Sequence, residues 1–180
     1  MVRTIAAGIA GALIMFVWAY VAHDMLPTAR VGLKTMPAAG EAAVMGAISG
    51  ATSAQAGLYV APAAAMNMQP DAPKSGPTAL IVYRPDVQYQ PMPIQIVGEF
   101  VLELVQCVIL AFILAGIAAG AGARIGFALA AGVMVGISTN GSYHIWFGFP
   151  HDYTAVQIGI QVVEYLLAGI VIALILPKRA

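Results

Sequence analysis

The sequence predicts an all-α membrane protein, a bundle of four transmembrane helices with a small α+β cap between the first and second helix. Of the 180 residues, 61% are hydrophobic and only 9% are charged, whereas about 25% of a soluble domain is charged. Four apolar stretches are long enough to cross a bilayer, since a membrane helix needs about 20 such residues. One polar, proline-rich stretch separates the first of them from the second.

The first predicted span covers residues 3–26. An apolar run extends from Ile5 to Ala22, and Pro27 ends the helix. The run is longer than the core of a signal peptide, which has about 7–15 residues, and its best cleavage pattern contains Trp18. We therefore expect a retained helix and not a cleaved leader.

Residues 27–92 are predicted to form the cap on the periplasmic side of the membrane. A helix is expected at about 38–49, because Pro37 suits its start and Gly50 its end. Two segments rich in β-branched and aromatic residues, at about 57–61 and 78–84, predict short strands.

The other spans are predicted at residues 93–120, 124–146 and 154–176. Residues 41–60 are an alternative fifth span, but they are polar and rich in Ala and Gly. A fifth span would also reverse the positive-inside bias. With four spans, the basic residues near the span ends lie in the cytoplasm together with both termini: Arg3, Arg124, Lys178 and Arg179.

Two spans carry matching polar stripes. The spacing i, i+4, i+7 places the polar residues of a stripe on one helix face. The second span has Glu99, Glu103 and Gln106, and the fourth has Gln157, Gln161 and Glu164. We expect the two stripes to lie at the same depth and to face each other, since polar groups in membranes usually face a bundle interior or a wet cavity.

The other two spans add polar groups in the same outer leaflet, namely His23, Asn140 and His144. One interpretation is a hydrogen-bonded seam that joins the helices. The other is a ligand site that combines these residues with the two stripes. Histidine and carboxylate are ligands for zinc, iron or manganese, so a metal would use Glu99, Glu103, His144 and His23.

A quinone or a lipid head group is an alternative ligand of the outer-leaflet pocket. A haem is disfavoured because no two of the histidines are predicted to face each other deep in the membrane. Met66 and Met68 are thioether ligands for copper(I), although two methionines in a loop are commonly only a loop. No cofactor is expected as the first choice, with a metal ion as the alternative.

Several function classes are excluded or disfavoured. Eight basic and eight acidic residues cancel, so no basic patch is predicted for nucleic acid, and one cysteine, Cys107, excludes an internal disulfide. A transport path needs polar groups in both leaflets, but residues 107–119, 125–135 and 168–176 have no acidic, basic or histidine side chain. Nucleophile-elbow, phosphate-loop and HExxH motifs are missing.

Three segments, GLYVAP, GFPHDYT and LAGIVIALILP, together resemble a group of small four-span bacterial membrane proteins of unassigned function. The resemblance extends over most of the chain and implies a location in the bacterial inner membrane. It implies no activity and no functional residue.

The sequence thus favours a non-catalytic membrane protein that works as an accessory or stabilising subunit of a larger assembly. Its expected partners are the lipid bilayer and other membrane subunits or further copies of itself. The alternative is a binding protein or enzyme whose Glu/His pocket holds a metal or a quinone.

Overall fold

The computed structural model describes residues 1–66, 75–85, 91–117 and 120–177. The chain divides into a helical unit, Met1–Leu33 with Pro91–Ala180, and a second unit, Lys34–Gln90. Within the described residues, four helices are long and apolar enough to cross a membrane, and two short strands pair in a small sheet. The predicted fold class is therefore confirmed.

The first span consists of α1 (Val2–Tyr20) and a π-helical turn, η1 (Val21–Met25). Leu26 is extended, as expected for a residue before proline, and a 3₁₀ turn, η2 (Pro27–Arg30), follows. The residues up to Leu33 belong to the helical unit, so the second unit begins seven residues later than the predicted start of the cap, Pro27.

The second span is α4 (Met92–Gly116). It ends earlier than the predicted residue 120, because Gly116 is a poor helix former and Ile117 adopts an extended conformation. Residues 118 and 119 of the predicted span lie outside the described residues.

The third span joins α5 (Ala121–Gly136), a π-helical turn η3 (Ile137–Gly141) and α6 (Ser142–Phe147). The chain stays helical through Gly141 and only widens there into the π-helical turn. Gly148, with φ of +70°, ends α6 in the left-handed conformation that favours glycine. The fourth span, α7 (His151–Ile175), starts directly after Pro150.

Close glycine contacts hold three of the helix pairs together. α1 packs on α4 and α7, and α5 packs on α7. A Cβ placed on Gly132 of α5 would lie 2.7 Å from the Cβ of Tyr165 on α7, and a Cβ on Gly8 of α1 would lie 2.8 Å from the Cα of Val108 on α4. Such contacts permit the close backbone approach that stabilises membrane helix pairs.

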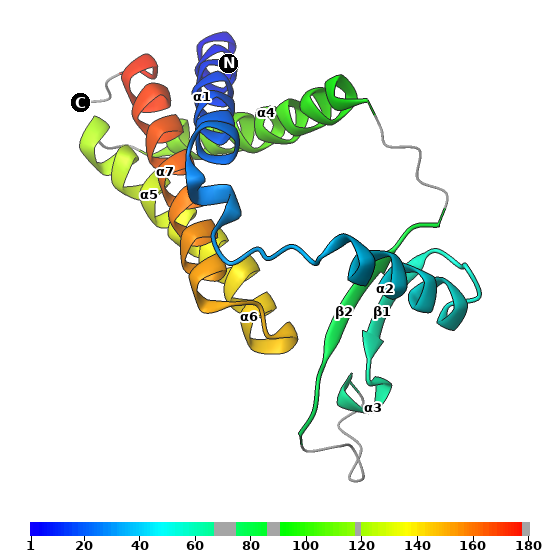
Figure 1. The fold of residues 1–180 in the computed structure, drawn as a ribbon. Coiled ribbons are helices and arrows are strands. Elements are labelled where there is room, and N and C mark those ends of the chain that lie inside the picture. The colour runs from blue at the N-terminus through cyan, green and yellow to red at the C-terminus, as the bar shows by residue number, and fades with distance from the viewer. Residues whose placement is uncertain (67–74, 86–90, 118–119, 178–180) are drawn as a thin grey trace. The chain divides into compact units, whose positions relative to one another are not determined.

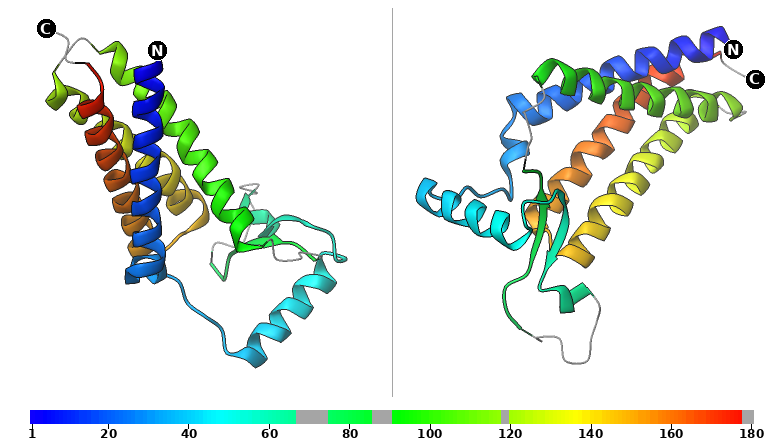
Figure 2. Two further views of the ribbon diagram at one scale, coloured as in Figure 1. Left: turned by 90° about the horizontal axis from the view of Figure 1, so that it is seen from above. Right: turned by 90° about the vertical axis from the view of Figure 1, so that its right-hand side faces the viewer.

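The α4 helix stands apart from α5 over most of its length. The two helices meet near the segment that connects them and diverge towards their other ends (Figures 1 and 2). An added Cβ at Gly116 or at Gly120 would have no neighbouring atom within 4 Å.

The second unit contains α2 (Ala38–Ala51), β1 (Gly57–Ala61), α3 (Ala63–Met66) and β2 (Ala79–Tyr83). The two strands are antiparallel, with Gly57 opposite Tyr83 and Ala61 opposite Ala79. The α2 helix, predicted to be amphipathic, buries none of its residues.

Candidate functional site

The α4 stripe is split between a buried and an exposed acid. Glu103 is only 3% exposed, and it lies one turn before the buried Cys107. Glu99, one turn before Glu103, is exposed. The two acids share one helix face, yet the helical unit covers only the second of them.

The polar stripes of α4 and α7 meet at one hydrogen bond. The hydroxyl of Tyr165 on α7 donates to the side-chain oxygen of Gln106 on α4 at 3.0 Å. The sequence prediction missed Tyr165, although it stands four residues after Gln161 and therefore on the same helix face. That spacing, together with its hydroxyl, was the signal that could have identified it.

A second hydrogen bond joins the third span to α7. Asn140, in the π-helical turn η3, is 8% exposed, and its amide donates to the side-chain oxygen of Gln161 at 3.0 Å. It also donates to the carbonyl of Gly136 at 3.2 Å. A π-helical turn frees a backbone carbonyl, which Asn140 satisfies here.

The buried carboxyl of Glu103 lacks a hydrogen-bond partner on one oxygen, Oε2. Glu164 and Glu99 are the acids near enough to act on it electrostatically. No hydrogen bond joins Glu103 to Glu164 within the described residues. Of the residues predicted for a hydrogen-bonded seam, Gln106 and Gln161 form interhelical hydrogen bonds, with Tyr165 and Asn140.

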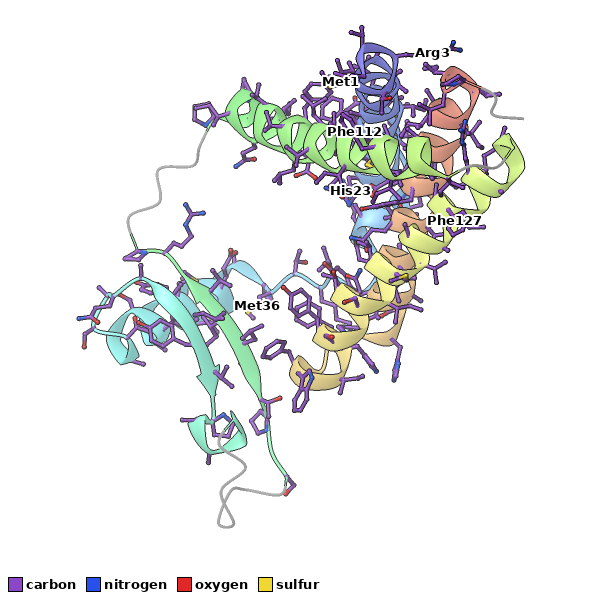
Figure 3. The ribbon with its side chains drawn as sticks, turned by 180° about the vertical axis from the view of Figure 1, so that it is seen from behind. Met1, Arg3, His23, Met36, Phe112 and Phe127 are labelled. Atoms are coloured by element: carbon purple, nitrogen blue, oxygen red, sulfur yellow. The ribbon has the colours of Figure 1, made fainter. Side chains whose placement is uncertain are left out.

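The histidines lie at the ends of the spans. His23 is exposed near the end of the first span that is remote from Arg3 (Figure 3), and its Nδ1 lies 2.9 Å from the carbonyl of Ala19. His144 Nδ1 lies 2.6 Å from the carbonyl of Phe149, and its ring centroid is 4.2 Å from that of His151.

The predicted metal ligands are not brought together. In residues 1–66, 75–85, 91–117 and 120–177, no three His, Cys, Asp or Glu side chains are grouped so that they could hold a metal ion. The set of Glu99, Glu103, His144 and His23 therefore stays a prediction of the sequence.

Gln157 is half-buried on α7. Met68 lies outside the described residues.

Two sulfur atoms are in contact beside this polar region. The Sγ of Cys107 lies 3.8 Å from the Sδ of Met15, and both residues are buried. The cysteine thus packs as a small hydrophobic residue between α4 and α1, as expected.

A buried arginine joins the other ends of three helices. Arg124, at the start of α5, is 1% exposed and donates to the carbonyls of Pro177 at 2.9 Å and Ile117 at 3.4 Å. Arg3 donates to the carbonyl of Ile175. Terminal carbonyls of a helix lack partners and carry partial negative charge, so both cations stabilise these helix ends. The sequence identified them only as topology signals.

Comparison of the chain with protein-family models, with curated proteins and with solved structures finds no match. The functional argument therefore depends on the geometry of the chain itself. The residues that meet in the membrane are Gln106, Tyr165, Gln161 and Asn140, with the unpartnered Glu103 beside them.

Proposed function

We propose that this integral membrane protein is a non-catalytic accessory subunit, which uses the first half of α4 to bind another membrane protein. The observation that supports this is the exposure of that half: every residue from Met92 to Leu102 is exposed except the half-buried Phe100. The rest of the helix, in contrast, contributes Cys107, Leu110, Ala111 and Leu114 to the core.

An acid in the exposed half makes contact with lipid alone unfavourable. Glu99 stands seven residues after the start of α4, which is about 10 Å along the helix. A carboxyl group at a lipid-facing position is costly, and such residues usually face protein or water. A partner helix along Met92–Leu102 would remove Glu99 from lipid and bury apolar side chains such as Val97.

Photocrosslinking in native membranes tests the proposal. A photoreactive amino acid at Val97 should give one discrete crosslinked product with a membrane protein that mass spectrometry identifies, and removal of that protein should abolish the product. Leu13 is the matched control, because it is similarly exposed on α1 but has no acid beside it.

Three outcomes have different meanings. A product of twice the chain mass would indicate self-association instead of a different subunit. An adduct within the chain, to residues 34–90, would contradict the docking role. Lipid adducts alone at both positions would contradict it as well.

A small ligand held by the polar cluster is the second candidate function. The unpartnered Oε2 of the buried Glu103 favours it, because buried polar atoms normally have a partner. Metal analysis and quinone extraction of the gently solubilised protein test this role. A stoichiometric ligand that is lost on Glu103→Gln would establish it and overturn the accessory role as the first choice.

The proposed location is the bacterial inner membrane, with residues 27–92 on the periplasmic side. The support is the distribution of basic residues at the span ends. Single cysteines at Ser75 and Lys178, in a Cys107→Ala background, should react with a membrane-impermeant reagent from opposite sides. Labelling of both from the periplasm would refute this topology.

A further inference from the structure

Three carboxyl groups of α4 and α7 are electrostatically coupled, and no basic side chain of the described residues offsets them. The charged groups that act on Glu103 are Glu164 and Glu99, and the one that acts on Glu164 is Glu99. A buried charge is costly unless it is paired. The acid cluster formed by Glu99, Glu103 and Glu164 can therefore be ionised as a whole only if a cation lies beside it.

The buried cation of the chain itself is not available to them. Arg124 is held by the carbonyls of Ile117 and Pro177. Ile117 is 14 residues after Glu103, which corresponds to about 21 Å along α4. Arg3 is likewise engaged at the end of α7, by the carbonyl of Ile175.

A cation from outside the helical unit has a route to the acids. Glu99 is exposed and Glu164 is half-buried, whereas Glu103 is covered. The α4 helix diverges from α5 on this side (Figure 2), so a helix that lies along Met92–Leu102 would pass directly beside Glu99. The Glu103 oxygen without a hydrogen-bond partner, Oε2, lies one turn further along α4.

We infer that the membrane partner of α4 inserts a lysine or arginine side chain beside Glu99 and Glu164, at about 10 Å from the start of the helix. This inference rests on the proposed docking role of α4 and adds the chemistry of the partner. Lys and Arg form charge-assisted hydrogen bonds with carboxylates, and their long side chains extend from one helix to the next.

The charge distribution disfavours a second copy of this chain as the occupant. A copy that docked through the same face would bring three more carboxyls to the cluster, and like charges across an interface are costly. Its buried arginine would be engaged at its own helix ends. A partner with a basic residue at the matching depth satisfies the cluster without this cost.

A synthetic transmembrane peptide tests the inference in vesicles of phosphatidylcholine. The full chain carries a donor fluorophore on Met92→Cys in a Cys107→Ala background. The acceptor-labelled peptide is a Leu/Ala helix with one lysine at the depth of Glu99, and the matched peptide has leucine there. We expect the lysine peptide to associate about fivefold more strongly, in line with the strength of polar contacts between membrane helices.

Variants of the chain identify the acids as the cause. Glu99→Gln together with Glu164→Gln should abolish the preference for the lysine peptide, while Glu41→Gln, an exposed acid of α2, should preserve it. An unchanged thermal unfolding midpoint shows that the variants are folded. If the double variant unfolds at a lower temperature, Glu99→Gln alone is used, because Glu99 is exposed and is covered by no other helix.

The failures of the two proposals can be told apart. Equal binding of both peptides, or a preference that survives the double variant, would overturn the cationic partner but leave docking at α4 intact. No association of either peptide would also overturn the cationic partner, and the crosslink at Val97 decides the docking role independently.

Discussion

The contact between α5 and α7 and the exposed half of α4 are two opposite arrangements of helices in a membrane. Between α5 and α7, glycines meet bulky residues, as where Gly132 contacts Tyr165 and Gly136 contacts Ile158. On α4, Gly98 has no atom within 4 Å of an added Cβ, and the residues around it are exposed. A glycine thus stabilises a pair only where the opposite helix supplies a side chain that fills the space above it.

The comparison also distinguishes polar side chains that join two helices from polar side chains that are left without a partner. Asn140 and Gln161 form a hydrogen bond inside the tightly packed pair. Glu99 and Glu103 lie on the less covered helix, and Glu103 has an oxygen without a hydrogen-bond partner. The satisfied pair fixes the position of the helices, whereas the unsatisfied oxygen of Glu103 supports the proposed binding role.

A bulky side chain at Gly132 should have the largest effect on stability. Gly132→Leu places a side chain against the Cβ of Tyr165 and the carbonyl of Gln161, so α5 and α7 must separate. We expect a loss of about 3 kcal/mol in the free energy of unfolding, the upper range for overpacking. Gly126→Leu on the same helix is the control, because an added Cβ there meets nothing within 4 Å. Thermal unfolding in detergent should show no comparable loss for that variant, and equal losses would refute the packing difference.

Removing the guanidinium of Arg124 should have the next largest effect. Arg124→Ala leaves the carbonyls of Ile117 and Pro177 without their donors, and one hydrogen bond to a charged group contributes about 1.5–3 kcal/mol. We expect a net loss of about 2 kcal/mol and partial recovery in Arg124→Lys, which keeps the charge but not the fork of donors. Chemical denaturation in micelles measures both. Full stability of Arg124→Ala would show that these helix ends do not need this link.

Replacing the unpartnered acid should have a small effect of the opposite sign. Glu103→Gln keeps the size of the side chain and replaces a carboxyl, whose charged form is disfavoured by burial and by Glu164 and Glu99, with a neutral amide. We expect the free energy of unfolding of the isolated chain to rise by about 1 kcal/mol or less. The thermal unfolding midpoint measures this, with Glu41→Gln as the control. A loss of more than about 1 kcal/mol would mean that the carboxyl already binds a partner or an ion.

Removing the hydroxyl that connects α7 to α4 should have the smallest effect. Tyr165→Phe deletes the hydrogen bond to Gln106 and keeps the ring that contacts Gly132. Such bonds in membranes are worth about 0.6 kcal/mol, and the unfolding midpoint should change accordingly. A loss as large as that of Gly132→Leu would show that α4 is held to α7 as firmly as α5 is.

The sequence predicted the spans well, because hydropathy and length are local properties. The α7 helix begins at His151, directly after Pro150 and three residues before the predicted start at Thr154. The candidate site was harder to predict. Glu99 and Glu103 have equivalent positions in the stripe, and only the packing of the other helices against α4 decides that one is exposed and the other buried.

Other contacts of the site depend on the same tertiary geometry. Tyr165 lay one position beyond the predicted stripe, and its bond to Gln106 exists because α7 turns that face towards α4. Arg124 was identified from its charge, but its carbonyl partners belong to helices that end near it only in the folded chain. Spacing along one helix cannot supply that information.

Oxygen accessibility of spin labels tests the central claim, that the helical unit leaves the first half of α4 uncovered. Single labels at Val97, at Leu13 and at Leu114 are measured in the purified protein in lipid nanodiscs, in a Cys107→Ala background. Leu13 is 53% exposed and Leu114 is fully buried, so they serve as the two references. We predict that Val97 is as accessible to oxygen as Leu13. Protection of Val97 to the level of Leu114 would show that the chain covers this face, and it would contradict the proposed docking role of α4.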